Sequence, residues 1–293
     1  MTKNISPSRI ILEVERVASD LRRGQSVILA QSEGDILIAS GEHRAGASVV
    51  RDPAHPGVKL LKLAGLLPTL VIESMPKDTG DFLRVSAKAI DAYPATLAQS
   101  LVQVSEANVP LASAENVRVI AFRPRFGHEE HLAVVIGNPA SLDAPFVRVH
   151  SSCVTGDVFG SLRCDCGSQL DKSVEMIKAQ GAGAILYLSQ EGRGIGIANK
   201  LRAYNLQDKG MDTVEANVAL GFAADERDFA LAAGMLRHLG MKRVTLLTNN
   251  PVKVDSLTRH GIEVVRREPL AIPSNMHNKQ YLDTKASKLG HQS

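Results

Sequence analysis

The feature that most constrains the fold of this chain is that all three of its cysteines fall within one short stretch. Cys153, Cys164 and Cys166 follow the spacing C-x10-C-x-C, a tighter cluster than chance placement predicts. Three is an odd number, and the N-terminus shows no pattern typical of a secretory signal, so a disulfide framework is not expected. Thiolates prefer soft divalent ions, of which zinc is the usual one. The spacing therefore predicts a metal site that the fold must assemble.

Two other interpretations of the cysteine stretch stay open at this point. Free cysteines are often small buried hydrophobic residues without a ligand. Alternatively, His150 completes a closed structural site with the three thiolates. Three protein ligands without a fourth leave one position for water, which is the arrangement of catalytic zinc, and the ion lowers the pKa of that water to about 7. We favour this open catalytic site.

Composition limits the classes of protein to which the chain can belong. Its 293 residues, 44% of them hydrophobic, are enough for two domains of ordinary size. The net charge of +3 does not indicate nucleic-acid binding, and the aromatic content of 4% without tryptophan offers few platforms for base stacking. No apolar run approaches the roughly 18 residues of a membrane span. We therefore predict a soluble cytoplasmic protein with neither nucleic acid nor membrane as a partner.

The first hundred residues predict a small α+β domain at residues 1–101. A helix is expected over residues 8–23, and its predicted inward face is made of Ile11, Val14, Val17, Ala18 and Leu21. Strands at 26–30 and 36–39 flank a turn, a short helix is expected at 58–66, and a strand at 68–73. Residues 41–57 are expected to be irregular, and residues 75–100 mix turn signals with a weak helical pattern.

The remainder, residues 102–293, predicts an α/β domain. Strands are expected at 117–121, 132–136 and 147–150. From Gln169 onward helices and strands alternate, with helices at 169–180, from about 196 to 209, from Asp225 and at 251–260, and strands at 184–188, 244–247 and 262–265. This order is typical of β-α-β units, so we expect a mixed sheet that is partly parallel.

Two loops follow predicted strands at their carboxyl ends, where ligands bind in open α/β sheets. One loop holds Glu191, Gly192 and Arg193, and the other runs over residues 248–250. The first loop lacks the spacing of a dinucleotide-binding fingerprint, so an ordinary strand-to-helix turn stays an alternative.

Cations at two predicted helix starts indicate an anionic ligand, because a helix N-terminus already carries positive partial charge. Asn250 is expected to be an N-cap with Lys253 at N3, and Asp225 an N-cap with Arg227 at N2. Two such ends in one domain favour a polyphosphate. The alternatives are that both cations point into solvent and that Asp225 is only a cap. Zinc-activated water beside a phosphate-binding surface suits metal-assisted hydrolysis of a nucleotide.

These motifs together resemble a known family. They are the run from Arg148 to Gln169, residues 190–193, 201–208, 212–217, 221–228 and 247–251, in which order and spacing are kept. From about residue 102 to Gly290 the chain closely resembles GTP cyclohydrolase II of riboflavin biosynthesis.

The resemblance implies a reaction in which GTP and water give formate, pyrophosphate and 2,5-diamino-6-ribosylamino-4(3H)-pyrimidinone 5′-phosphate. It implies that Cys153, Cys164 and Cys166 hold one zinc ion, that magnesium accompanies the triphosphate, and that the protein is a homodimer. Arg227 is implied as the nucleophile that releases pyrophosphate, Asp225 as the proton acceptor, and Tyr204 as a neighbour of the ring-opening centre. The implied GTP-binding residues are Arg148, Val149, His150, Ser151, Ser152, Gln169, Glu191, Gly192, Arg193, Thr213, Thr248 and Lys253.

Two positions qualify what the resemblance implies. The family usually has Glu where this chain has Ser152, which puts one nucleotide or magnesium contact in doubt. A guanidinium stays protonated and is a poor nucleophile, so chemistry alone favours a charge-stabilising role for Arg227.

The N-terminal region is similar to the opening of 3,4-dihydroxy-2-butanone 4-phosphate synthase, but in a degenerate form. The acidic run of that family is reduced here to Glu33 and Asp35, whose alternative role is a polar hairpin turn. Magnesium needs carboxylate ligands, so synthase activity is not expected. For the whole chain, the alternative function is a zinc-stabilised protein that binds guanine nucleotide or RNA without turnover.

Overall fold

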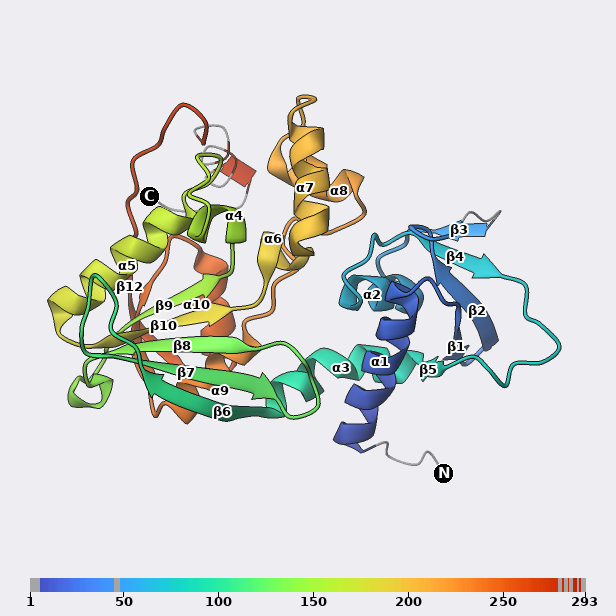
Figure 1. Cartoon of the computed structure of the whole chain (residues 1–293), viewed down its shortest axis with the longest axis horizontal. Helices are drawn as coiled ribbons and strands as arrows, with labels where there is room; N and C mark the ends of the chain where they lie inside the picture. The colour runs from blue at the N-terminus through green and yellow to red at the C-terminus, as the bar shows by residue number, and fades with distance from the viewer. Residues whose placement is uncertain are drawn as a thin grey trace.

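The structure is a computed structural model that describes residues 6–44, 48–278, 281, 284, 287, 288 and 290. Two β-sheets in this part of the chain lie side by side, and helix α3 (Ala87–Gln99) leads from one to the other (Figure 1). We call residues 6–99 the N-terminal body and residues 101–290 the C-terminal body. Within the described residues, no helix combines the length and the apolar composition needed to cross a bilayer.

The N-terminal body is a five-stranded sheet in the order β3-β4-β2-β1-β5, covered by three helices. The strands are β1 (Val27–Gln31), β2 (Gly34–Ser40), β3 (Ser48–Val50), β4 (Leu70–Glu73) and β5 (Arg84–Ser86), and the other helices are α1 (Pro7–Arg22) and α2 (Pro56–Leu63). The predicted inward face of α1 is buried, so this helix and the β1–β2 hairpin are confirmed. The sequence analysis missed β3, β5 and the full length of α3. Strands β3 and β5 have only three residues each, too few for a recognisable pattern, and Pro94 interrupts the helical pattern of α3.

The C-terminal body is built on a seven-stranded mixed sheet in the order β12-β11-β9-β10-β8-β7-β6. Its strands are β6 (Leu101–Asn108), β7 (Val117–Pro124), β8 (His131–Ile136), β9 (Phe146–Ser151), β10 (Gly183–Leu188), β11 (Arg243–Leu247) and β12 (Glu263–Glu268). Strands β12, β11, β9 and β10 run parallel, whereas β10, β8, β7 and β6 pair antiparallel. The predicted mixed α/β sheet is confirmed.

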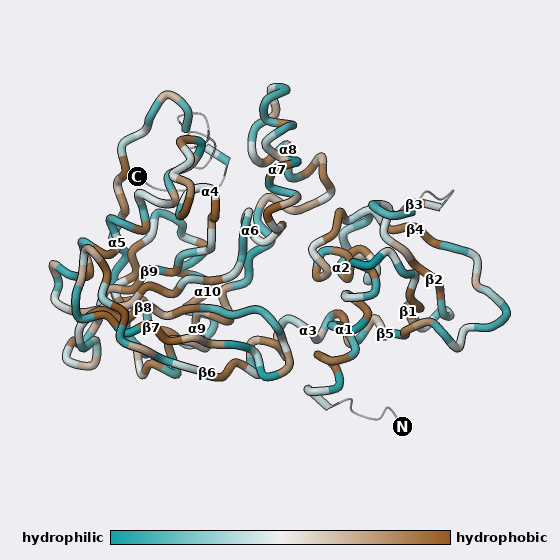
Figure 2. Tube along the Cα trace, viewed as in Figure 1, coloured by the Kyte–Doolittle hydropathy of each residue, from teal (hydrophilic) through white to brown (hydrophobic). Residues whose placement is uncertain are grey.

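Helices cover both faces of this sheet. The covering helices are α5 (Cys166–Gln180), α9 (Ala230–His238) and α10 (Pro251–Arg259). This body also contains α4 (Val154–Asp157), α6 (Glu191–Gly194), α7 (Gly196–Gln207), α8 (Thr213–Ala219) and a 3-10 turn at Pro139–Ser141. Buried side chains of α9 and α10 pack with Val147 and Val149 of β9, while Ile177 of α5 packs with Ile185 on the opposite face. Apolar stretches lie along the strands of both sheets (Figure 2).

The helix expected from Asp225 begins later than predicted, at Ala230. The Asp225 side chain accepts hydrogen bonds from the backbone and guanidinium of Arg227, which holds the segment in a tight turn instead of a helix. Asp228 accepts from the Ala230 amide. Asp225 as N-cap and Arg227 at N2 are therefore wrong. Phe229 and Leu236 face the core and are buried.

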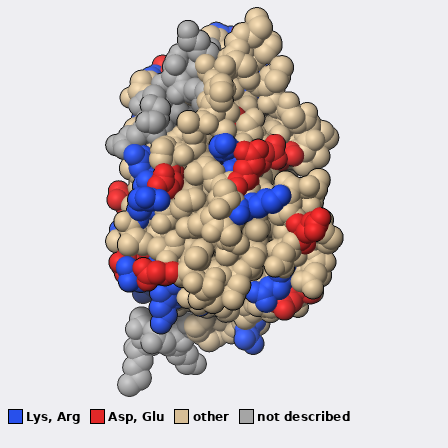
Figure 3. Space-filling model, turned by 90° about the vertical axis from the view of Figure 1, so that its left-hand side faces the viewer, with Lys and Arg blue, Asp and Glu red and all other residues tan. Residues whose placement is uncertain are grey.

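Charges of both signs are interspersed on the described surface. At the end of the C-terminal body that faces away from the N-terminal body, Lys and Arg side chains stand beside Asp and Glu side chains (Figure 3). Ion pairs between exposed groups, such as Arg243 with Glu263 at 3.3 Å, contribute about 1 kcal/mol or less each. Surface electrostatics of this kind do not select a ligand.

His131 at the start of β8 is a buried histidine that must stay neutral. It is 1% exposed, its Nδ1 accepts a hydrogen bond from the Ser189 amide at 3.1 Å, and its Nε2 has no hydrogen-bond partner among the described atoms. Burial lowers the pKa of His131 to about 4. In the unfolded chain the same group has a pKa of about 6.5, so the unfolded state binds more protons as the pH falls through this window.

We therefore expect stability to be lost between pH 6.5 and pH 4, with a contribution from His131 of roughly 3 kcal/mol at the acidic end. His131→Asn keeps an acceptor for Ser189 without a titratable ring, so its unfolding free energy should depend less on pH in this window. Urea denaturation followed by circular dichroism at pH 7, 5.5 and 4.5 measures both proteins. Equal pH slopes for the two would contradict the assignment.

Candidate active site and metal centre

A cavity opens at the carboxyl ends of the parallel strands β11, β9 and β10. Cys153 follows β9, residues 191–193 follow β10 and residues 248–250 follow β11, so three neighbouring strands deliver three motifs to one edge. Of the predicted site residues, Val149 and Asp225 lie outside the cavity wall. Those that line it are Arg148, His150, Ser151, Ser152, Cys153, Cys164, Cys166, Gln169, Glu191, Gly192, Arg193, Tyr204, Thr213, Arg227, Thr248 and Lys253.

The three cysteines converge at one end of this cavity. Their sulfur atoms all lie within 4.8 Å of one another, and the thiols are free. Cys153 Sγ and Cys164 Sγ are 3.7 Å apart, close to the roughly 3.8 Å that two sulfurs keep on a tetrahedral zinc with bonds of about 2.3 Å. A Cβ atom on Gly156 would come within 2.8 Å of Cys164 Sγ, so a glycine is needed there. This cluster can bind a soft metal ion.

His150 does not join the cluster. Its Nε2 lies 3.1 Å from the carboxylate of Asp157, which also accepts from the Cys153 amide and the Tyr187 hydroxyl, each at 2.9 Å. Burial lowers the pKa of His150, although Asp157 opposes this shift. Across the described residues, the three cysteines are the only group of three or more side chains placed to hold a metal ion. The geometry therefore favours the open site over a closed Cys3His site.

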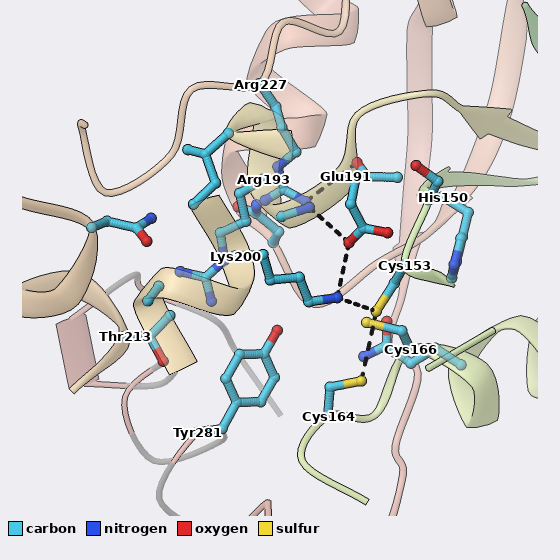
Figure 4. Close-up of a pocket in the computed structure, with 18 of the residues that line it drawn as sticks. His150, Cys153, Cys164, Cys166, Glu191, Arg193, Lys200, Thr213, Arg227 and Tyr281 are labelled. Carbon is cyan, nitrogen blue, oxygen red and sulfur yellow. Dashed lines mark hydrogen bonds and ion pairs between the residues drawn. The ribbon is translucent and has the colours of Figure 1, made fainter. Parts of the chain in front are cut away.

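Lys200 on α7 is a site residue that the sequence analysis missed. Its buried ammonium donates to Cys153 Sγ at 3.0 Å and to Glu191 at 2.8 Å (Figure 4). It also donates to the Thr155 hydroxyl at 2.8 Å. Hydrogen bonds from the other two thiols, and then from Lys200, lower the pKa of Cys153. A lysine within a helix is usually a solvated residue, and only the fold reveals that this one points at the thiol cluster.

Cationic side chains line the rest of the cavity. Both terminal nitrogens of Arg193 are buried without a hydrogen-bond partner among the described residues, and its guanidinium lies 5.6 Å from the ring centroid of Tyr281. Burial lowers the pKa of Arg148 to about 10, and this side chain donates to the Leu247 carbonyl at 3.0 Å and to Gln169. Unsatisfied buried guanidinium groups are costly, so Arg193 is suited to an anionic ligand.

Arg227 and Asp225 form a partly buried ion pair beside this cation-rich wall. The Arg227 Nε donates to Asp225 at 2.8 Å, and its Nη1 lies 3.4 Å from the Ser151 hydroxyl. Burial disfavours both charges, but the pair outweighs it, which lowers the pKa of Asp225 and raises the pKa of Arg227. Asp225 does not line the cavity itself but contacts Arg227, which does.

Helix α10 begins as predicted, and the Lys253 ammonium in its first turn is bonded to the backbone of β9. The Asn250 side chain caps the helix by accepting from the Val252 amide. Lys253 does not point into solvent, because its ammonium donates to the Val149 carbonyl at 2.7 Å and is buried. Val149 therefore takes part through its backbone, while its side chain lies in the core. Lys253 ties α10 to β9 at the cavity floor.

Tyr204 and Ser152 have partners that explain their positions. The guanidinium of Arg163, in the loop between the cysteines, lies 4.4 Å from the Tyr204 ring centroid and pairs with Asp208 at 2.8 Å. Burial raises the pKa of Tyr204, which keeps its hydroxyl protonated.

Ser152 accepts from the Gln190 amide at 3.2 Å and so links β9 to the loop after β10.

Comparison with known proteins gives consistent matches. The family model described as GTP cyclohydrolase II matches residues 102–269. The GTP cyclohydrolase-2 of Azospirillum brasilense is 49% identical over 243 residues, which cover 80% of this chain and 63% of that protein. The GTP cyclohydrolase-2 of Hahella chejuensis is 58% identical over 163 residues, 56% of this chain and 79% of that protein. The riboflavin biosynthesis protein RibBA of Chlorobium phaeovibrioides is 40% identical over 283 residues, 95% of this chain and 69% of that protein.

Proposed function

The chain belongs to the GTP cyclohydrolase II family, and from this premise we propose that it hydrolyses GTP to formate, pyrophosphate and 2,5-diamino-6-ribosylamino-4(3H)-pyrimidinone 5′-phosphate, the first step of riboflavin biosynthesis. The observation that carries the proposal is one cavity with a thiol cluster at one end and a cation-rich wall beside it. The chain spans 63% of the Azospirillum relative, so the activity is proposed from this chain's own site as well as from likeness.

We infer that Cys153, Cys164 and Cys166 hold one zinc ion. The sulfur spacing and the donor chemistry both fit this ion. When bound, zinc supplies an activated water for attack at C8 of guanine. Lys200 offsets part of the negative charge of the three thiolates through its contact with Cys153. The Lys200 ammonium therefore helps to keep the three cysteines in the thiolate form that binds zinc.

The triphosphate fits the cation-rich part of the cavity. Two terminal nitrogens of Arg193 have no partner in the part of the chain that the structure describes, and Arg227 lines the same cavity. Magnesium would accompany the phosphates, because it is usually held by phosphate oxygens together with one or two carboxylates. Glu191 is engaged with Lys200 and the Val154 amide, so its proposed role is to order the loop around the nucleotide.

The reacting groups have separate roles in this proposal. Arg227 stays protonated because Asp225 raises its pKa, so it stabilises charge at the α-phosphate instead of acting as a nucleophile. Asp225 has a lowered pKa and is a weak base, which suits it to orienting Arg227. The protonated Tyr204 hydroxyl can donate a hydrogen bond near the ring-opening centre. The implied nucleophilic role of Arg227 is thus not the one that the electrostatics support.

We propose a homodimer as the working unit. Val158, Phe159 and Leu162 lie in the loop between the cysteines, and their side chains are 68%, 76% and 58% exposed. Apolar groups this exposed suit burial against a second copy of the chain. Light scattering on the purified protein measures its mass directly.

We further propose that residues 1–101 form a domain without synthase activity and residues 102–293 the cyclohydrolase domain. Glu33 lies exposed at the β1–β2 turn, and Asp35 pairs with Arg84 of β5. Among the described residues of this body, no carboxylate cluster is placed to hold magnesium. The purified protein is therefore expected to form no dihydroxybutanone phosphate from ribulose 5-phosphate and magnesium. Product detection by mass spectrometry in a sample that turns over GTP would contradict this.

One assay separates the leading proposal from a nucleotide-binding protein without turnover. The protein is incubated with GTP, zinc and magnesium, and formate and a new pyrimidine absorbance are followed. The proposal expects both products in equal amounts. Intact GTP in a sample that binds GTP and contains one zinc per chain would support the binding protein instead.

A further inference from the structure

An ion pair joins the two bodies beside the candidate active site. Lys62 of α2 contacts Glu226 with 2.5 Å between Nζ and Oε1, and the two side chains are only 16% and 23% exposed. Glu226 stands between Asp225 and Arg227 in the chain. The N-terminal body is thus in direct contact with the segment that carries the Asp225–Arg227 ion pair of the site.

Glu226 is the junction of several contacts. Its carboxylate accepts from the Ala223 amide at 2.6 Å, and its own amide donates to the Arg193 carbonyl at 3.1 Å. A Cβ atom on Gly194 would lie 3.2 Å from the Glu226 backbone, so the two segments pack without room for a side chain. We call these residues, 221–228, the 221–228 segment. Through Glu226 this segment is hydrogen-bonded to, and packed against, the loop that contains Arg193.

Further contacts place the N-terminal body along α7. Arg202 pairs with Glu42 at 3.0 Å, and Glu42 also accepts from the Leu67 amide at 2.5 Å. The Asn199 side chain lies 3.3 Å from the Gly65 carbonyl. These residues flank Lys200 on the same helix, so the N-terminal body supports both the α7 side and the 221–228 side of the cavity.

The Pro68 ring of the N-terminal body packs against Gly221, the first residue of the 221–228 segment. A Cβ atom on Gly221 would lie 2.8 Å from Pro68 Cγ, and Gly221 has a φ of +89°. Lys62 also lies 5.8 Å from the ring centroid of Phe222. The segment is therefore held from the N-terminal body at its start and near its end.

We propose that the N-terminal body is a positioning element for the cyclohydrolase site, and that Lys62 is the positioning residue that sets the 221–228 segment through Glu226. This inference rests on the proposed function. Without Lys62, a largely buried carboxylate loses its cation, which costs more than loss of an exposed pair. Glu226 then turns toward water, and the geometry of the neighbouring Asp225–Arg227 pair relaxes. The effect belongs to the chemical step, because Lys62 itself touches neither the thiol cluster nor the cavity wall.

The test compares two lysines of one helix. Lys62→Ala is expected to lower kcat about tenfold, equivalent to about 1.4 kcal/mol, with KM changed less than about twofold. Lys59→Ala removes the same charge one turn earlier, where Lys59 pairs with Asp91 inside the N-terminal body at 2.7 Å, and should leave kcat unchanged. Lys62→Arg keeps the charge and should restore most of kcat. Equal kcat in Lys62→Ala and wild type, or equal losses in Lys62→Ala and Lys59→Ala, would overturn the proposal.

Amide hydrogen exchange of the full-length chain provides a readout that does not need turnover. Exchange in the 221–228 segment should be faster in Lys62→Ala than in Lys59→Ala and wild type, because the Glu226 carboxylate that accepts from the Ala223 amide loses its anchor. If wild type showed no GTP turnover, the proposed function would fail while this measurement still tested the positioning role. Unchanged exchange in Lys62→Ala would overturn that role whatever the activity.

Discussion

GTP turnover by the Cys164→Ser protein is expected to fall by more than about a hundredfold, because loss of groups that merely support metal ligands already costs about 10- to 100-fold. Two thiolates cannot hold zinc in the geometry that the three sulfur atoms define. Zinc content should fall together with activity. Formate release and metal analysis of the same sample measure both quantities.

Ser168→Ala is the matched control for this substitution. Ser168 is exposed on α5, two residues beyond Cys166, so its variant should keep both zinc and turnover. Circular dichroism checks that each variant is folded. A folded Cys164→Ser protein with wild-type turnover would remove the thiol cluster from the mechanism.

Arg227→Ala is expected to lower kcat by roughly a hundredfold to a thousandfold, with pyrophosphate release lost, because a preorganised cation at a reacting phosphate acts mainly in the transition state. Lys253→Ala should instead raise KM. It should also lower the melting temperature, since the Val149 carbonyl loses a buried donor. Steady-state kinetics and thermal unfolding of both variants separate the two roles.

Arg259→Ala provides the control, because Arg259 is exposed at the end of α10. It should match wild type in kcat, KM and melting temperature. If Arg227→Ala raised only KM, Arg227 would be a binding residue and its charge-stabilising role would be wrong.

Elements with strong periodicity could be predicted from the sequence. The apolar face of α1, the β1–β2 hairpin and the alternation of α5, β10, α10 and β12 each follow from local patterns, and the structure contains each of these elements. The Asn250 cap and the convergence of the cysteines likewise follow from local chemistry and spacing. Such features depend on residues close together in the chain.

Features that depend on distant partners could not be predicted. Asp225 has the residue type of an N-cap, but its ion pair with Arg227 prevails over helix formation. Lys200 has the pattern of a solvated helix residue, and only the packing of α7 brings it to Cys153. The Lys62–Glu226 contact joins residues 164 positions apart, which no local pattern indicates.

The backbone of Arg193 carries a consequence for protein engineering. Arg193 has a φ of +62°, the only positive value for a non-glycine residue in the described part of the chain, and it sits between Gly192 and Gly194. An arginine in this conformation costs about 1 kcal/mol or more relative to glycine. A screen that rewards heat resistance alone is therefore expected to favour glycine at this position, which would remove the guanidinium that we propose binds the triphosphate. Thermostable variants of this protein are better sought by holding residue 193 fixed and randomising elsewhere.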